Sequence, residues 1–330
     1  MSQPKSNRLS TGGIIDRNHP LSFTFDGRKM QGFKGDTLAS ALIANGIRIV
    51  GRSFKYHRPR GILGSGSEEP NALVELRSGA RREPNTRATV AELYEGLEAR
   101  SQNRWPSLAF DVMEINSLFS PLFGAGFYYK TFMWPKSFWE SVYEPAIRRA
   151  AGLGRAPEGL DPDHYEKAFA HCDILIIGGG PAGLSAALAA GRSGARVILC
   201  DEGPVLGGRL LSERRFINDF PAAEWVRSVE AELSSMANVT LMRRSTVFGV
   251  YDHGVYGVIE SVNDHVAEPP PYQPRQRSWR VIAKRAVLAA GSIERPMLFG
   301  NNDRPGVMLG SAVRTYVNRF AASPGHRTVV

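Results

Sequence analysis

Apolar and polar residues alternate over residues 21–25 in the manner of a strand with one buried face. Asp26 and Gly27 follow, and this pair favours a tight hairpin turn because glycine readily adopts a positive φ. The pattern therefore predicts a hairpin whose return strand covers residues 28–33.

A short helix is predicted after the hairpin. Residues 35–37 (Gly-Asp-Thr) provide an N-cap for the apolar run at 38–44, and Gly46 favours the left-handed turn that ends a helix. A further strand is expected at residues 72–76. Hairpin, helix, loop and strand together predict a small α+β domain over residues 21–100.

Residues 1–20 show no such pattern and are expected to form a flexible arm. Residues 101–170 are rich in aromatic side chains without a clean period, and residues 152–163 read as a linker rich in Gly and Pro. The aromatic side chains either pack on the neighbouring domains or form a contact with another subunit, since interface cores favour Tyr, Trp and Phe. They are Phe119, Phe123, Phe127, Tyr128, Tyr129, Phe132, Trp134, Phe138, Trp139 and Tyr143.

The pattern changes at residue 171. Residues 172–177 form a continuous apolar run, as expected of a parallel strand buried on both faces. A glycine-rich turn, an Ala- and Leu-rich helix at 184–192 and a second strand at 196–200 follow. This order predicts a β-α-β unit, and we expect an α/β Rossmann-type domain over residues 171–330.

The glycine-rich turn has the residue types that a dinucleotide site needs. Gly178 permits the tight turn out of the strand, Gly180 lets the backbone approach a pyrophosphate, and Gly183 lets helix and strand pack closely. The helix N-terminus offers free N–H groups and a partial positive charge to the anion. The alternative is a glycine-rich turn in another kind of α/β domain.

Acidic and basic side chains follow the second strand. Asp201 lies about 20 positions after the glycines, where a carboxylate accepts hydrogen bonds from ribose hydroxyls, and Glu202 is the adjacent candidate. Arg209 follows a glycine pair and either faces a phosphate or is a solvated surface arginine. A short buried strand at 285–291 is expected to return beneath the nucleotide.

Composition narrows the range of functions. A length of 330 residues fits about two domains, and 42% hydrophobic residues allow a real core. The net charge of +9 suits phosphate-bearing cofactors, an acidic partner or nucleic acid, but no nucleic-acid-binding motif occurs, so no nucleic-acid partner is expected. The histidines lack metal-ligand spacing, so no metal is assigned.

The two cysteines and the N-terminus suggest a compartment. Cys172 and Cys200 are interpreted as small buried residues of a reduced compartment. Residues 1–10 lack the apolar core of a secretory signal, and no apolar stretch is long enough to span a membrane. The expected location is therefore cytoplasmic.

Several phrases of the sequence are similar to a known family. They are residues 35–42 (GDTLASAL), 52–61 (RSFKYHRPRG) and 126–135 (GFYYKTFMWP), together with the glycine pair at 207–208 and the Ala-Ala-Gly at 289–291. With the turn at residue 178, the chain resembles the two-dinucleotide-binding flavoprotein superfamily. More narrowly, it resembles the N-terminal part of the alpha subunits of heterotetrameric sarcosine oxidases. Cyanide synthase and opine dehydrogenase subunits are relatives with similar pieces.

The resemblance implies a function for the whole complex. Such an enzyme demethylates sarcosine oxidatively to glycine, hydrogen peroxide and a tetrahydrofolate-bound one-carbon unit. The alpha subunit binds NAD, the beta subunit binds FAD, and FMN lies between alpha and beta; gamma and delta subunits complete the heterotetramer. Amine oxidation is not expected on this chain alone, and its catalytic residues are unknown. The implied cofactor-binding residues are Gly178, Gly179, Gly180, Pro181, Ala182, Gly183, Asp201, Glu202, Gly208, Arg209, Val247, Ala290 and Gly291.

The N-terminal domain resembles the ferredoxin-like domain of these oxidases. An iron–sulfur cluster needs four cysteine thiolates, and residues 47–76 contain no cysteine, so no cluster is predicted. The corresponding loop is basic, which indicates either an anion-facing or subunit-facing loop or a solvated charged loop. Its basic residues are Arg48, Arg52, Lys55, His57, Arg58 and Arg60.

Two other functions stay open, because NAD and FAD use the same glycine fingerprint. FAD in the Gly178 site would indicate a cyanide synthase or opine type of amine dehydrogenase subunit. A non-catalytic assembly module is the third possibility. The chain ends in residues that resemble the start of another strand, so a fragment with an incomplete nucleotide domain is expected.

Overall fold

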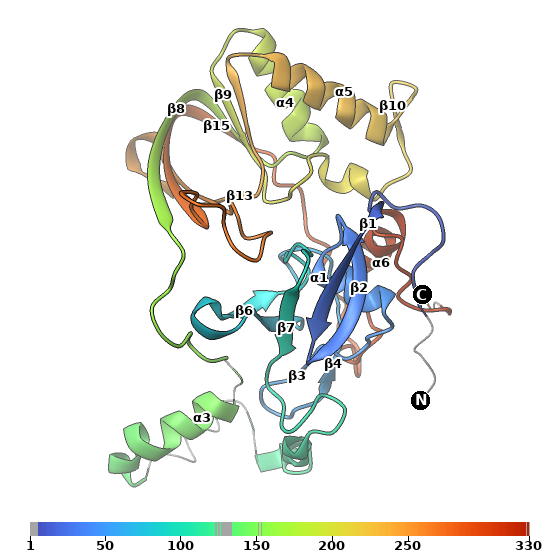
Figure 1. Cartoon of the computed structure of the whole chain (residues 1–330), viewed down its shortest axis with the longest axis vertical. Helices are drawn as coiled ribbons and strands as arrows, with labels where there is room; N and C mark the ends of the chain where they lie inside the picture. Colours follow the sequence, from blue (N-terminus) through green and yellow to red (C-terminus); the bar gives the residue numbers. More distant parts are fainter. Residues whose placement is uncertain are drawn as a thin grey trace.

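Two units, each built on its own sheet, make up the structure (Figure 1). It is a computed structural model that describes residues 6–122, 124, 126, 134–150, 152, 154–327 and 329. The first unit has one apolar core and the second has two, one on each side of its sheet. We call them the N-terminal unit and the nucleotide unit.

The N-terminal unit is a mixed sheet of five strands in the order β2-β1-β7-β5-β6. The predicted hairpin is confirmed: Asp26 and Gly27 both have positive φ and join two antiparallel strands. β1 also pairs in parallel with β7, so strands distant in sequence lie side by side. The strands are β1 (Asp16–Phe25), β2 (Arg28–Lys34), β5 (Leu73–Leu76), β6 (Glu83–Arg87) and β7 (Leu97–Ser101).

The predicted helix α1 (Leu38–Ala44) is also confirmed, with every residue buried against the sheet. Thr37 is its N-cap, and the side chains of Thr37 and Ser40 each accept a hydrogen bond from the other's backbone N–H. This capping box satisfies two N–H groups that the first turn of a helix leaves unpaired. The buried carboxylate of Asp36 accepts a further bond from Ser40 Oγ at 2.6 Å.

The expected arm is attached to the N-terminal unit over its described part. Arg8 donates two hydrogen bonds to the Asp36 carboxylate, at 2.6 and 3.1 Å, and another to the carbonyl of Phe320. The Asn7 backbone N–H bonds to the Ala44 carbonyl at 2.8 Å. Residues 16–20 belong to β1. Arg8 and several backbone hydrogen bonds therefore hold residues whose apolar pattern alone predicts no structure.

The segment between the units contains short helical turns and the helix α3 (Glu144–Ala150). Phe119, Trp134 and Phe138 are exposed, and Trp134 is 83% exposed. Phe123, Phe127, Tyr128, Tyr129 and Phe132, named in the aromatic prediction, lie outside the described residues. The short elements up to α3 are β3 (Gly51–Arg52), β4 (Pro59–Arg60), η1 (Gly79–Arg81), η2 (Val112–Ser117), η3 (Ser120–Leu122), η4 (Lys136–Phe138) and η5 (Trp139–Tyr143).

The nucleotide unit is a six-stranded sheet in the order β12-β9-β8-β15-β14-β13. Strands β12, β9, β8 and β15 run parallel, and β14 and β13 continue antiparallel. The predicted β-α-β unit is confirmed, although β8 begins earlier and α4 begins at Pro181, before the expected residue 184. Its elements are β8 (Tyr165–Ile177), α4 (Pro181–Arg192), β9 (Val197–Cys200), η6 (Gly208–Leu211), β10 (Phe216–Ile217), β11 (Phe220–Pro221), α5 (Ala222–Ser235), β12 (Val239–Met242), β13 (Ser245–Tyr251), η7 (Asp252–Gly254), β14 (Val255–Glu260) and β15 (Gln276–Leu288).

Cys172 and Cys200 lie buried on β8 and β9 and form no disulfide. Burial raises the pKa of the Cys172 thiol to about 11 and that of the Cys200 thiol to about 12. Both side chains therefore stay protonated at neutral pH and act as small apolar residues, because the thiolate is the reactive form. Within the described residues, no helix is long and apolar enough to cross a bilayer.

The last helix, α6 (Gly310–Asn318), returns to the N-terminal unit (Figure 1). Leu309, Ala312, Tyr316 and Phe320 belong to the same core as α1 and the first sheet. The buried Tyr316 hydroxyl donates to the carbonyl of Gly64 at 2.9 Å. The sequence pattern groups α6 with the nucleotide domain, whereas these contacts make it part of the N-terminal core.

Two ion pairs that share the buried carboxylate of Asp163, just before β8, connect the two units. Asp163 accepts hydrogen bonds from Arg81 of the N-terminal unit at 3.0 Å and from Arg275 of the nucleotide unit at 2.8 Å. The Arg275 side chain is 2% exposed and also donates to the carbonyls of Asn263, Val266 and Ala267. This shared carboxylate therefore fixes the start of β8 relative to both units.

Asp163 gives a pH-dependent prediction. Burial raises its pKa, but the hydrogen bonds and charges of Arg275 and Arg81 outweigh this and lower it from 3.8. A folded-state pKa below the unfolded value stabilises the fold above the unfolded pKa, and this stability is lost as the pH falls through the folded pKa. Asp163→Asn should cost about 1–3 kcal/mol at pH 7, and this cost should fall progressively as the pH drops below 3.8 toward the lowered pKa of Asp163. Urea unfolding from pH 3 to 7 measures this; an equal cost at both ends, or a similar profile for exposed Asp252→Asn, would contradict it.

The return of α6 gives a second prediction. Tyr316→Phe removes one buried hydroxyl and leaves the Gly64 carbonyl without its donor, so the free energy of unfolding should fall by about 1–2 kcal/mol. The matched control is Tyr272→Phe, whose ring is 99% exposed. Thermal or urea unfolding compares the two, and an unchanged stability of Tyr316→Phe would refute the importance of this contact.

Candidate dinucleotide site

The turn between β8 and α4 has the conformation that the glycine pattern predicts. Gly178 has φ +106°, and a methyl group placed on it would lie 2.5 Å from the Ala289 carbonyl oxygen. A methyl group on Gly183 would overlap the carbonyl oxygen of Gly178. Both positions therefore exclude larger residues because protein backbone lies against them.

Gly180 differs from its two neighbours. A methyl group placed there meets nothing within 4 Å, so the space in front of it is open. Gly180 is the N-cap of α4 and has no side-chain hydrogen bond that caps the helix. Pro181 has no N–H, so the first donors of α4 are those of Ala182 and Gly183. A helix N-terminus with open space before it is an arrangement that binds phosphate.

Asp201 lies at the end of β9 beside this turn. Its carboxylate accepts a hydrogen bond from the Gly179 N–H at 2.6 Å and another from the Gly203 N–H at 2.8 Å. Each oxygen keeps a lone pair in the plane, so the carboxylate can still accept from a hydroxyl group. The two bonds hold the glycine turn and the β9 loop together.

Glu202 is exposed and points toward the N-terminal unit, where Ser67 Oγ lies 3.4 Å from its carboxylate. Desolvation by the surrounding protein raises the pKa of the Glu202 carboxyl, and the negative charges of Asp201 and Glu68 raise it further. The hydrogen bond from Ser67 lowers this pKa in part. This contact brings the turn at Ser67 next to Glu202.

The other predicted residues of the first half of the site lie nearby. Pro181 and Ala182 form the first turn of α4, and Ala182 is exposed. Gly208 has φ +51°, and a methyl group on it would lie 3.0 Å from the Gly180 Cα. Arg209 faces away: it pairs with Glu213 at 2.6 Å and its side chain is 59% exposed. An arginine four residues before a glutamate is thus satisfied on its own helical turn.

The remaining predicted residues come from the second half of the sheet. Val247 lies on β13 opposite Val258 and packs on the core under the sheet. Ala290 and Gly291 follow β15 and are exposed, while the Ala289 N–H bonds to the Ile177 carbonyl at 2.8 Å. The end of β15 thus lies directly beside Gly178. The prediction of a short buried strand at 285–291 is wrong: β15 is longer, ends at Leu288, and its last five residues are exposed.

Sequence reasoning missed the side chains that the N-terminal unit places beside this site. Glu92 accepts two hydrogen bonds from Arg244, at 2.5 and 2.9 Å, and the Arg244 N–H bonds to the Gly203 carbonyl. Ser67 reaches Glu202, and Asn318 of α6 donates to the Ser212 carbonyl at 2.8 Å. No local pattern marks these residues, because each pair is far apart in the sequence.

The basic loop of the N-terminal unit is largely paired within the chain. Arg52 is buried and donates to the carbonyl of Leu108 and the carboxylate of Glu114. Arg58 and Arg60 both pair with Asp303, at 2.8 and 2.6 Å. The ring of His57 is buried 2.7 Å from the Asp111 carboxylate. These charges therefore join the loop to later segments of the chain.

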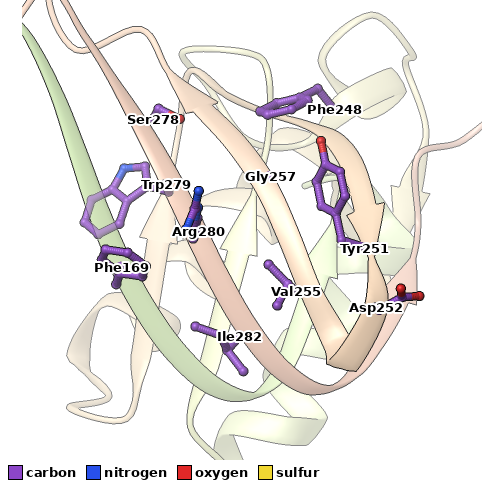
Figure 2. A pocket seen from close by; sticks show the side chains of 10 residues that line it. All are labelled: Phe169, Phe248, Tyr251, Asp252, Val255, Gly257, Ser278, Trp279, Arg280 and Ile282. Carbon is purple, nitrogen blue, oxygen red and sulfur yellow. The ribbon is translucent and has the colours of Figure 1, made fainter.

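A separate hollow of about 680 Å³ lies on the curved outer part of the nucleotide sheet (Figure 2). Phe169, Phe248, Tyr251, Trp279 and Arg280 extend into it from β8, β13 and β15. It shares no residue with the glycine turn or with Asp201, so it is distinct from the candidate dinucleotide site. No group of three or more metal-ligating side chains occurs in the part of the chain that the structure describes.

Two family profiles match the two units. Residues 18–104 match the 2Fe-2S iron-sulfur cluster binding domain family, and residues 173–261 match the FAD dependent oxidoreductase family. The first match agrees with the predicted ferredoxin-like fold. Its cluster does not fit this chain, because residues 18–104 contain no cysteine and such a cluster is held by thiolates.

A solved structure shares the architecture. The L-proline dehydrogenase from P. horikoshii aligns with a TM-score of 0.61 and 20% identity over 98% of this chain and 50% of that chain. At this identity the likeness shows the fold alone. It confirms the Rossmann-type arrangement that the sequence predicts.

Curated relatives extend over nearly the whole chain. The sarcosine oxidase subunit alpha of Rhizobium meliloti (strain 1021) is 61% identical over 98% of this chain and 33% of its own length. The same subunit of Corynebacterium sp. (strain U-96) is 36% identical over 100% of this chain and 30% of its own length. The chain thus spans about a third of the length of these relatives, and it is a homologue of sarcosine oxidase alpha subunits over that third.

Proposed function

We propose that this chain is the NAD-binding part of the alpha subunit of a sarcosine oxidase complex. The observation that carries the proposal is the open space before Gly180 at an uncapped helix N-terminus, with Asp201 beside it. The similarity to sarcosine oxidase alpha subunits supports the choice of complex.

Different residues around the turn bind different parts of the dinucleotide. The first N–H groups of α4 hold the diphosphate, because they have no intrahelical partner and carry the positive end of the helix dipole. Asp201 and Glu202 accept hydrogen bonds from the adenosine ribose, and Ser67 limits the space on the other side of Glu202. When NAD is bound, its nicotinamide supplies hydride exchange; the residues of this chain bind and orient the dinucleotide.

The whole complex is proposed to demethylate sarcosine to glycine, with hydrogen peroxide and a tetrahydrofolate-bound one-carbon unit as the other products. FAD and FMN would belong to the beta subunit and to its contact with alpha, and gamma and delta subunits would complete the heterotetramer. The amine would therefore be oxidised on another chain. The two buried free cysteines suit a cytoplasmic location.

FAD in the same turn is the second candidate. The match of residues 173–261 to FAD dependent oxidoreductases favours it, and the open space before Gly180 accepts the diphosphate of either cofactor. In that case the chain would be a flavin-bearing subunit of an amine dehydrogenase of the opine or cyanide synthase type. A flavin spectrum of the purified protein would support this candidate over NAD.

Binding measurements on three forms of the protein test the site. Gly180→Asp should abolish NAD binding in calorimetry, because a carboxylate enters the open space and repels the diphosphate. Its stability should stay within about 1 kcal/mol of the wild type, since no protein atom occupies that space. Gly183→Ala is the matched variant: its methyl group overlaps the Gly178 carbonyl, so it should lose about 1–3 kcal/mol of stability.

The outcomes separate the candidates. Binding of NAD that disappears in Gly180→Asp supports the proposal, and the same result with FAD supports the second candidate. Equal binding by wild type and Gly180→Asp would place the ligand elsewhere and contradict both. If neither dinucleotide binds, even with the beta subunit present, the chain serves only in assembly.

A further inference from the structure

The strongest unexplained feature of the molecule is the side chain of Arg319, one residue beyond α6. Its Nε is fully shielded from solvent and has no hydrogen-bond partner. Within the described residues the guanidinium group makes neither a hydrogen bond nor an ion pair, and its contact is with the ring of Phe320, 5.0 Å from the centroid. Arg319 is half-buried and only its Nε is fully shielded, so the terminal nitrogens of the guanidinium group, which carry four of its five N–H donors, remain open to a ligand.

The lack of an ion pair within the described residues distinguishes Arg319 from the other arginines with a shielded Nε. Arg58, Arg77 and Arg82 also have a shielded Nε without a partner, but each forms an ion pair through another nitrogen or at slightly longer range. Arg319 has none. Leaving buried donors unmet costs free energy, and such a group in a folded protein requires an explanation.

Arg319 lies at the joint where the N-terminal unit meets the candidate dinucleotide site. Its neighbour Asn318 donates to the Ser212 carbonyl, just after the glycine pair at 207–208. Burial lowers the pKa of Arg319, whereas the negative charges of Asp201 and Glu92 act in the opposite direction. One of them is the predicted ribose-binding residue.

Neither carboxylate is available as an exclusive partner. Glu92 already holds Arg244 through two hydrogen bonds. Asp201 uses one oxygen for the Gly179 N–H and the other for the Gly203 N–H. Neither carboxylate therefore uses the Arg319 donors, which remain available to a ligand.

We propose that Arg319 donates hydrogen bonds to the ADP half of the bound dinucleotide and so makes the N-terminal unit part of the binding site. The ADP half is the part that NAD and FAD share, and it is the part that lies beside the residue at the end of β9. An arginine matches its phosphate and ribose oxygens because it presents several donors in one plane. This inference rests on the proposed dinucleotide site at Gly180.

Calorimetry with ADP, NAD and FAD on the full protein tests the contact. Arg319→Met keeps the length of the side chain and removes its donors, so the affinity for ADP should fall about 10- to 100-fold, as for a lost charge-assisted hydrogen bond. Arg319→Lys should recover part of that lost affinity, because lysine restores the positive charge but not the planar set of guanidinium donors. Adenosine, which lacks phosphate, should bind both forms with a smaller difference.

The matched control lies one turn earlier on α6. Arg314→Met removes a cation that lies 3.4 Å from Glu213 and has a side chain 41% exposed, and the affinity for ADP should stay within about twofold of the wild type. Thermal unfolding without ligand adds a readout that separates binding from structure. Arg319→Met should unfold near the wild-type temperature, because the guanidinium has no partner to lose, but ADP should stabilise it much less.

The opposite pattern overturns the inference. A large drop in the ligand-free unfolding temperature with unchanged ADP affinity would make Arg319 a structural residue. Should the wild type bind no dinucleotide at all, the proposed function and this inference both fall; should it bind but Arg319→Met bind equally, only this inference falls.

Hydrogen exchange on the wild type keeps the test independent of any variant. Binding of ADP should slow amide exchange at the end of α6, around residues 315–320, as well as in the turn at 178–183. Slower exchange in the glycine turn alone would contradict a contact with Arg319.

Discussion

The Asp201 carboxylate connects the ends of two loops, and the candidate site depends on this link. One oxygen accepts from the Gly179 N–H and the other from the Gly203 N–H, at 2.6 and 2.8 Å. Because these bonds run to backbone, they position the glycine turn whatever side chains surround it. The acidic residue at the end of β9 thus has a structural role in addition to any contact with a ribose. Its geometry explains why the turn can stay open at Gly180 without collapsing onto its neighbours.

One ion pair and two hydrogen bonds across the two units complete the surroundings of that turn. Glu92 with Arg244, Asn318 with the Ser212 carbonyl, and Ser67 with Glu202 all join the N-terminal unit to the loops after β9. The unit that matches a 2Fe-2S cluster binding domain family has no cysteine over residues 18–104, and its polar side chains contact the loops beside the candidate dinucleotide site. Its basic loop is likewise held by Asp303 and Glu114.

The sequence predicted the local elements well wherever a short-range rule governs them. Asp26-Gly27, Thr37 and the spacing of Gly178, Gly180 and Gly183 all depend on neighbours within a few residues, and the structure has the hairpin, the capped helix and the β-α-β turn that they indicate. Arg209 shows the limit of such reasoning: the sequence left open a phosphate contact or a solvated surface side chain, and it did not indicate the ion pair with Glu213 that the structure has. Arg319 and α6 were beyond reach, because their position is decided by packing against residues far away in the sequence.

The place of α6 has a consequence for the order of synthesis. The N-terminal core contains Leu309, Ala312, Tyr316 and Phe320, which follow the entire nucleotide unit in the chain. In topological terms the nucleotide unit is inserted into the N-terminal one. Every strand of the second sheet must therefore leave the ribosome before the core of the N-terminal unit can be completed. The usual order, in which an N-terminal domain finishes folding first during synthesis, cannot apply here.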